Sequence, residues 1–219
     1  MRYPVFWGCM FALYALSCNN EGKSTATGQD TATANGNVRK DDRISFPSFF
    51  EFLEQQDSSF DAGLFQSEGT LAFTEPSSPI DTNALKEYLP YMVYNSDRSL
   101  ATDIISYNYV PGTSNNRIVF EEAGPDFEAA LLDIKKNTRT RLLFFGTTGF
   151  VYAARWENDH TALLAGIIDM EADSVRPALW RFDLHQQTKT VYMYPSLVRA
   201  NMSLLKREIP LHVRTSRAF

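Results

Sequence analysis

Short apolar runs separated by polar turns cover most of the chain, which is the pattern of β-strands rather than of long helices. Asn, Asp, Ser, Gly and Pro supply the turns between the runs. The pattern predicts two successive antiparallel meanders, residues 91–145 and 150–194. The predicted strands are Tyr91–Tyr94, Leu100–Tyr109, Arg117–Glu121, Ala129–Ile134 and Thr140–Phe145, followed by Phe150–Trp156, Ala162–Ile168, Ala178–Leu184 and Thr190–Tyr194.

An internal repeat links the two meanders. The stretch LLDIKKNTRTRLLF, Leu131–Phe144, returns as RFDLHQQTKTVYMY, Arg181–Tyr194, with one Asp and two Thr at identical places. Each copy has the strand-turn-strand pattern of a β-hairpin. The openings of the units match as well, because Tyr94-x-Ser96-Asp97-x-Ser99 parallels Trp156-x-Asn158-Asp159-x-Thr161.

Helices are predicted outside the meanders. Ser48 and Glu51 have the spacing of a capping box at the start of a helix over Pro47–Gln56. Asp81 or Thr82 begins a second helix, which Pro90 ends. Three further elements are expected: a strand at Thr70–Phe73, a C-terminal helix at Ser196–Lys206 and an edge strand at Ile209–Val213.

We therefore predict an α+β fold, mainly antiparallel β, with two repeated units of four or five strands, two N-terminal helices and a C-terminal helix. In pattern alone the units resemble blades of WD-repeat or TolB-like propellers. A propeller closes with at least about four blades and this chain supplies two, so closure within one chain is excluded. The two sheets are expected to stack face to face or to form one curled sheet, with the N-terminal helices covering a face or an edge.

The N-terminus has the features of an export signal. Val5–Leu16 is apolar and too short to span a bilayer, and the run ends at Ala15-Leu16-Ser17-Cys18. Here the chain resembles a bacterial lipoprotein precursor, in which such a Cys becomes the lipidated first residue. Ala15 and Leu16 exchange the usual order of the motif, and Arg2 is the one basic residue before it. A conventional signal peptide cleaved nearby, or a buried apolar start, is the alternative.

A polar tether follows the cysteine. Asn19–Asp42 has Val38 as its one large apolar residue and cannot bury enough surface to fold. We predict a signal peptide at 1–17, a lipidated tether at 18–42 and one globular domain at 43–219. Over the first two segments the chain resembles uncharacterised lipoproteins of Bacteroidota. The resemblance implies an exported protein held at the cell envelope by lipid on Cys18, in the outer membrane rather than the inner.

Composition narrows the function classes. The 219 residues have a net charge of -5, which argues against nucleic-acid binding because phosphate contacts need clustered Lys and Arg. The domain after the tether contains no Cys, so it has neither a disulfide nor a Cys-based metal site.

No catalytic set, cofactor motif or metal site stands out in the sequence. His160, His185 and His212 are far apart and form no ligand pair. The acidic pairs Glu121-Glu122 and Asp126/Glu128 lack the spacing of a calcium loop, and we interpret them as solvated faces.

Aromatic residues near strand ends favour a binding role over an enzymatic one. Tyr107, Tyr109 and Trp156 are of the kind that recognises peptides or sugars, and Asp159 and His160 follow at a predicted hairpin tip. With 10 Tyr and 16 Phe, however, many of the aromatics must fill the core.

Two hypotheses of different classes remain. The leading one is a non-enzymatic binding or scaffold module of the envelope, with a protein or a glycan as partner. The rival is a tethered hydrolase assembled in three dimensions around Asp159 and His160. A pocket that gathers His160 with two or more carboxylates would favour the hydrolase, whereas an aromatic groove on a smooth surface would favour binding.

Overall fold

Residues 45–114, 117–171, 173–201 and 204 are those that the computed structural model describes, and they belong to the unit Thr33–Phe219. The predicted signal peptide, the lipidation site Cys18 and the tether lie outside the described residues, as does the predicted edge strand Ile209–Val213.

Strands dominate the described residues, as the sequence predicted. The helical elements are α2 (Pro47–Gln56), η1 (Ala62–Leu64), α3 (Thr82–Leu85) and η2 (Leu89–Tyr91). The strands are β1 (Gln66–Ala72), β2 (Ser77–Pro79), β3 (Val93–Tyr94), β4 (Leu100–Asp103), β5 (Tyr109–Ser114), β6 (Arg117–Glu122), β7 (Phe127–Asp133), β8 (Thr138–Phe145), β9 (Phe150–Asn158), β10 (Thr161–Glu171), β11 (Ser174–Asp183), β12 (Thr188–Met193) and β13 (Val198–Arg199).

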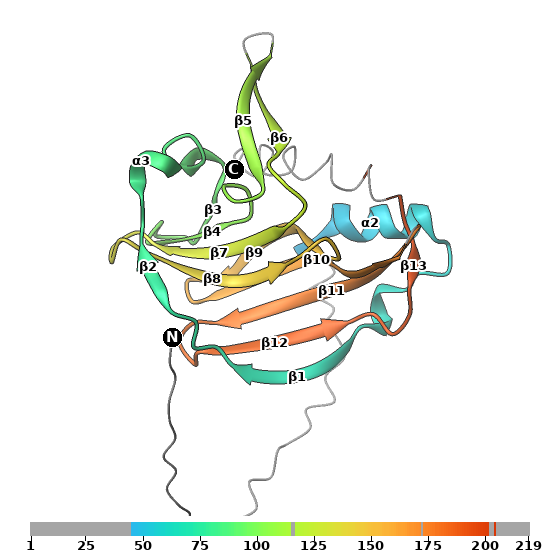
Figure 1. Ribbon diagram of the computed structural model, residues 1–219. Coiled ribbons are helices and arrows are strands. Elements are labelled where there is room, and N and C mark those ends of the chain that lie inside the picture. Colours follow the sequence, from blue (N-terminus) through green and yellow to red (C-terminus); the bar gives the residue numbers. More distant parts are fainter. Residues whose placement is uncertain (1–44, 115–116, 172, 202–203, 205–219) are drawn as a thin grey trace, which may run out of the picture. The chain divides into compact units, whose positions relative to one another are not determined.

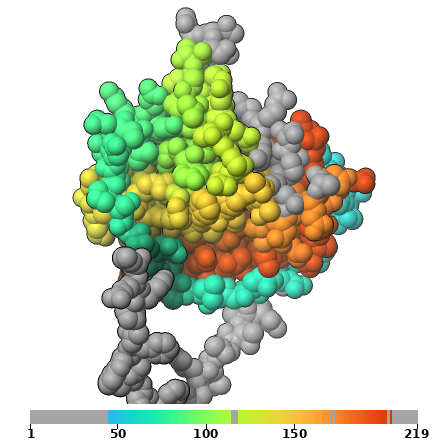
Figure 2. All heavy atoms as spheres, viewed as in Figure 1, coloured from blue at the N-terminus to red at the C-terminus, as the bar shows by residue number. Residues whose placement is uncertain are grey.

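Most strands belong to two antiparallel sheets with the same order. Sheet A runs β1-β12-β11-β10-β9, with β13 paired to β11, and sheet B runs β2-β8-β7-β4-β3 (Figure 1). Strands β5 and β6 form a separate two-stranded ribbon that extends away from both sheets (Figures 1 and 2). The fold is α+β and mainly antiparallel β, which confirms the predicted class.

The two repeated hairpins have the same register. Asp133 pairs with Thr138 in β7–β8, and Asp183 pairs with Thr188 in β11–β12. At each turn the Asp Oδ1 accepts a backbone N–H from the third residue after it, at 2.9 Å in the first hairpin and 2.8 Å in the second. The residue before the returning strand has positive φ in both hairpins: 55° at Asn137 and 52° at Gln187.

One segment of chain, residues 66–79, lies along the outer edges of both sheets, and we call it the strap. Its strand β1 pairs with β12 and its strand β2 pairs with β8. The hydroxyls of Thr70 and Thr190 are 2.8 Å apart in sheet A, and those of Ser77 and Thr140 are 2.6 Å apart in sheet B. The sequence predicted a strand here at Thr70–Phe73 and did not predict β2.

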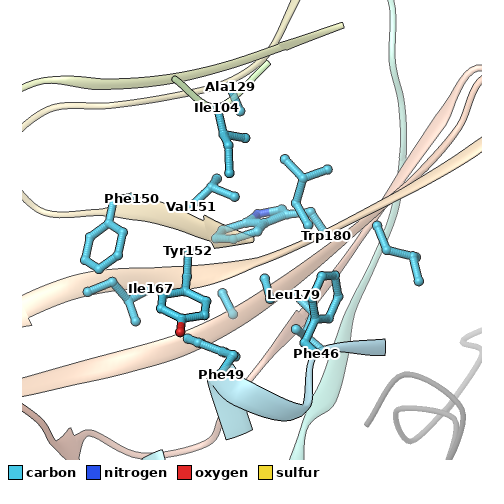
Figure 3. Close-up of a cluster of buried hydrophobic side chains, with 14 of the residues drawn as sticks. Phe46, Phe49, Ile104, Ala129, Phe150, Val151, Tyr152, Ile167, Leu179 and Trp180 are labelled. Atoms are coloured by element: carbon cyan, nitrogen blue, oxygen red, sulfur yellow. The ribbon is translucent and has the colours of Figure 1, made fainter. Parts of the chain in front are cut away.

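The sheets stack face to face, which is one of the two arrangements that the sequence left open. The rings of Phe145 in sheet B and Trp180 in sheet A lie 5.5 Å apart between the sheets. On the other side of sheet A, Tyr152 points toward Phe49 of α2, with ring centroids 5.4 Å apart (Figure 3). On the other side of sheet B, the α3–η2 segment packs Leu85 and Met92 against the sheet.

Helix α2 is held by burial rather than by its predicted cap. Its N-cap is Phe46, with no side-chain cap bond, so the Ser48–Glu51 capping box is not formed. Pro47 has no N–H to satisfy and begins the helix instead. Four buried side chains, each contributing about 1.5–3 kcal/mol by burial, fix the helix on sheet A: Phe49, Phe50, Phe52 and Leu53. The cap predicted for the second helix is correct, since Asp81 accepts the N–H groups of Asn83 and Ala84.

The two sheets stack with the inner face of one against the outer face of the other. Leu131 faces the core between the sheets, and the register places Arg181 at the equivalent position of sheet A. Because Trp180 points toward sheet B and neighbouring side chains alternate, Arg181 points away from sheet B, where it pairs with Glu157. Equivalent faces therefore point in the same direction, and the sheets are not related by a two-fold axis.

Three details differ from the predicted meander. The strand that begins at Leu100 ends at Asp103, because Asp103 Oδ1 accepts the N–H groups of Ile105 and Ser106 and turns the chain. The predicted strand Arg117–Glu121 pairs with β5 in the projecting ribbon instead of joining sheet B. Val198 and Arg199 form β13 rather than the beginning of the predicted C-terminal helix.

The openings of the two units differ in length by one residue. Leu100 pairs with Asp133, whereas Thr161 pairs with Asp183, so Leu100 is the counterpart of Thr161. The ungapped sequence match instead placed Ser99 against Thr161. The first loop accommodates its extra residue with a positive φ of 56° at Arg98.

Candidate functional site

A pocket of about 900 Å³ lies at the turn end of the two sheets. It is lined by three parts of the chain: the strap, the inner face of sheet B and the hairpin ends of sheet A. This volume falls within the range of roughly 300–1,000 Å³ that is usual for small-molecule sites. The pocket is therefore the candidate functional site.

The register of sheet B places one row of pocket residues side by side. Ser77, Thr140 and Leu131 are paired across β2, β8 and β7, so their side chains share the inner face. Asp133 and Thr138 form the next row toward the turn, and both also line the pocket.

Two histidines contribute the wall from sheet A. His160 lies in the β9–β10 turn and His185 in the β11–β12 turn. The N–H of Leu184 donates to the carbonyl of His160 at 2.8 Å, which holds the two turns together. The imidazole centroids lie 6.5 Å apart, and both histidines line the pocket.

The lysines at the rim are paired with carboxylates. Lys136 Nζ lies 2.9 Å from Asp133 Oδ2, and Lys135 Nζ lies 2.9 Å from Asp97 Oδ2. Partial burial alone would raise the pKa of the Asp133 carboxyl, but hydrogen bonds from the amide and ammonium of Lys136 hold this pKa below its usual range. The hydrogen bonds of Ser99 and Lys135 likewise lower the pKa of Asp97.

The pocket gathers His160 with Glu75 and Asp133, which is the composition expected of the rival hydrolase. The geometry of an acid–base pair is absent from the described residues, since no histidine among them forms an ion pair with a carboxylate. The described part of the chain also contains no group of three His, Cys, Asp or Glu that could hold a metal ion.

Asp159 does not line the pocket with its neighbour His160. Its carboxylate accepts the hydroxyl of Ser96, and its carbonyl accepts Asn95 Nδ2 at 3.3 Å. Trp156, also predicted as a binding residue, donates Nε1–H to the carbonyl of Val93 at 2.9 Å. Asp159 and Trp156 therefore connect β9 and its turn to the opening of the first unit.

Tyr107 and Tyr109 do not line the pocket either. Tyr107 is exposed, and its ring lies 6.1 Å from that of Phe144, which in turn stacks under the Arg141 guanidinium at 4.9 Å. Tyr109 is buried, and burial together with the nearby Glu122 carboxylate raises the pKa of its phenol. The aromatic residues predicted for binding are thus divided between separate places.

Glu128 corrects one of our interpretations, because it is buried rather than part of a solvated face. Just 2% of its surface is exposed. The carboxylate pairs with the guanidinium of Arg139 and, at 2.7 Å, with Nε of Arg141. Asp103, equally buried, lies 3.9 Å from Arg139. This cluster lies on the outer face of sheet B, where its ion pairs link side chains of β4, β7 and β8.

Sequence reasoning missed most of the pocket residues. His185, Thr138 and Thr140 were noticed as parts of the repeat, without a functional role. The strap residues Phe73 and Glu75 carried no signal, because no motif marks a residue that meets a pocket through strand pairing.

None of the helices in the described part of the chain is long and apolar enough to cross a membrane. The chain matches no protein-family model, no curated protein and no solved structure.

Proposed function

We propose that this chain is a lipid-anchored protein of the cell envelope whose folded domain binds a ligand in the pocket between the two sheets. Binding, without chemistry, is its primary role. The single observation that carries the proposal is the pocket itself, which is built jointly by the strap, sheet B and two turns of sheet A. The anchor rests on the apolar run before Cys18 and on the polar segment after it.

The anchor is tested by labelling with palmitate. Wild-type protein is expected to incorporate label and to fractionate with membranes, whereas Cys18→Ser should do neither. Two or more acyl chains are needed for stable anchoring at ~0.8 kcal/mol per buried CH₂. An unlabelled wild-type protein with a mature N-terminus elsewhere would show ordinary secretion instead.

Ligand binding is tested by photo-crosslinking in the cell. Benzoylphenylalanine is placed at His185, which lines the pocket, or at Gln186, the next residue on the same exposed turn, which does not. An adduct found by mass spectrometry at position 185 and absent at 186 supports a bound ligand. Equal labelling at the two positions, or none, contradicts the proposal.

A tethered hydrolase is the second candidate, because the pocket contains His160 together with Glu75 and Asp133. A general acid or base contributes about 10²–10⁴-fold to a rate. The wild-type chain and His160→Ala are compared on chromogenic ester and glycoside substrates. A loss of that size in the variant would support the hydrolase, and equal background rates would exclude it.

A further inference from the structure

We propose that the ligand of the pocket is an uncharged, polyhydroxylated molecule, namely a neutral oligosaccharide. This inference rests on the proposed function, because it names the ligand class of the same pocket. It follows from the charge balance, the hydrogen-bonding groups and the strand edges at this end of the sheets.

Charge balance argues against a strongly charged ligand. Lys136 is paired with Asp133 and Lys135 with Asp97, and Glu75 adds one further carboxylate to the lining. The paired lysine side chains are 79% and 70% exposed, so their pairs contribute little to stability. They nevertheless leave the pocket close to neutral, without the cluster of unpaired cations that an anion would need.

The polar lining consists mainly of groups that both donate and accept hydrogen bonds. Five residues with hydroxyl groups line the pocket; Ser77 and Thr140 are linked to each other at 2.6 Å, and Ser99 Oγ accepts Asn95 Nδ2 at 3.3 Å. A hydroxyl donates one hydrogen bond and accepts two, so each member of the Ser77–Thr140 pair can still bond to a ligand. The hydroxyl-bearing residues are Thr74, Ser77, Ser99, Thr138 and Thr140. The hydroxyls of a sugar have the same double character.

The rest of the lining supplies apolar surface. Phe73, Leu131 and Leu184 contribute it, and the Phe73 ring is fixed by an edge contact with Phe182 at 5.2 Å. The C–H faces of a sugar ring can pack on such groups while its hydroxyls reach the polar residues.

The strand edges at the pocket disfavour an extended peptide. A peptide commonly binds a sheet by adding a strand to a free edge. Here β2 covers the edge of β8 at Thr138–Thr140 and β1 covers the edge of β12, so the outermost strands on this side belong to the strap itself. Within the pocket, a ligand therefore meets mainly the side chains that line it, which suits a polyol.

The experiment is isothermal titration of the full chain with neutral trisaccharides from glucan, mannan, xylan and chitin, with trigalacturonate as an anionic probe and trialanine as a peptide probe. Thr140→Val removes a pocket hydroxyl. The matched control is Thr190→Val, because Thr190 has the equivalent register and an equivalent hydroxyl bond to Thr70 but does not line the pocket. Loss of one ligand hydrogen bond should weaken binding roughly five- to tenfold.

The expected result is that a neutral trisaccharide binds and that 0.5 M salt changes its affinity by less than about a factor of two. Thr140→Val should weaken this binding, whereas Thr190→Val should leave it unchanged. Binding of trigalacturonate or trialanine alone, sensitive to Thr140→Val, overturns the inference and leaves the proposed pocket function standing. If no probe binds and no crosslink forms at position 185, both the oligosaccharide inference and the proposed binding function are contradicted.

Discussion

Two buried polar side chains of sheet B, Glu128 and Thr102, differ in how their polar atoms are satisfied. Glu128, on the outer face, has two arginine partners. The hydroxyl of Thr102 has no hydrogen-bond partner among the described residues. Thr102 pairs with Leu131 and therefore lies on the inner face, next to the pocket. Losing a partner of Glu128 would leave a buried charge, whereas losing the Thr102 hydroxyl removes a desolvation cost.

Thr102→Val is therefore expected to stabilise the domain. Valine has nearly the same shape, and an unsatisfied buried hydroxyl costs about 1–3 kcal/mol. We expect the free energy of unfolding to rise by about 1 kcal/mol, measured by urea denaturation. Thr190→Val is the control, because its hydroxyl has a partner and its removal should not stabilise. A clear loss of stability in Thr102→Val would show that the hydroxyl is bonded in solution.

Asp133 predicts acid sensitivity. The pKa of its carboxyl is held below the ordinary value of 3.8 in the folded state, so the native carboxylate contributes stability that is present above that value and is lost as pH falls through the lower folded pKa. Wild type should be more stable than Asp133→Asn at pH 6, and the difference should disappear as pH falls below about 4. Thermal melts along a pH series measure it, and Lys136→Met should reduce the same difference. A constant difference at every pH would contradict this origin.

At the scale of elements, the sequence predicted those hairpins and helix caps whose hydrogen bonds join residues close together in the chain. The repeated hairpins follow from Asp, Thr and turn residues close in sequence, and Asp81 identified its helix because a cap acts within one turn. The turn at Asp103 was not predicted. The apolar residues after Asp103 continue the strand pattern, so the sequence gives no sign that this Asp side chain accepts backbone N–H groups and ends the strand.

The pocket could not be predicted, because its walls meet through long-range pairing. Thr70 and Thr190 are bonded across 120 positions, and the strap they belong to brings Phe73 and Glu75 to the hairpin ends. His160 was singled out, but its predicted partner Asp159 bonds to Ser96 instead. Periodicity predicts which face a residue occupies and does not predict which distant strand covers that face.

Trp156→Phe distinguishes a structural from a binding role for the indole. The variant removes the Nε1 bond to Val93 and leaves a partly buried carbonyl with one partner fewer. Stability should fall by about 1 kcal/mol, measured by urea denaturation, while photo-crosslinking at position 185 persists. If the crosslink is lost and stability is unchanged, the result would support the original prediction that Trp156 is a binding residue.

At the scale of the whole described domain, the two sheets share the main hydrophobic core, and a smaller cluster of four buried residues lies on the outer face of sheet B, under α3 and η2. One continuous cluster of buried residues contains side chains from sheet A, sheet B and α2. The strap pairs with both sheets, and Trp156 and Asp159 of sheet A bond to the opening of sheet B. Separating the sheets would expose Trp180 and Phe145 together. The two repeats are therefore expected to unfold as one unit, unlike the stepwise behaviour of long repeat arrays.

Ile167→Val tests this cooperativity. Ile167 is fully buried on the face of β10 that packs against α2, away from sheet B (Figure 3). Loss of one methyl group there should lower global stability by about 0.5–1.5 kcal/mol. Native-state hydrogen exchange should then show an equal loss of protection for the slowest amides of β11 and of β7, although Ile167 lies on the face of β10 that points away from sheet B. Unchanged protection in β7 would mean that sheet B remains folded when sheet A opens, so that the pocket between them could open without unfolding the whole domain.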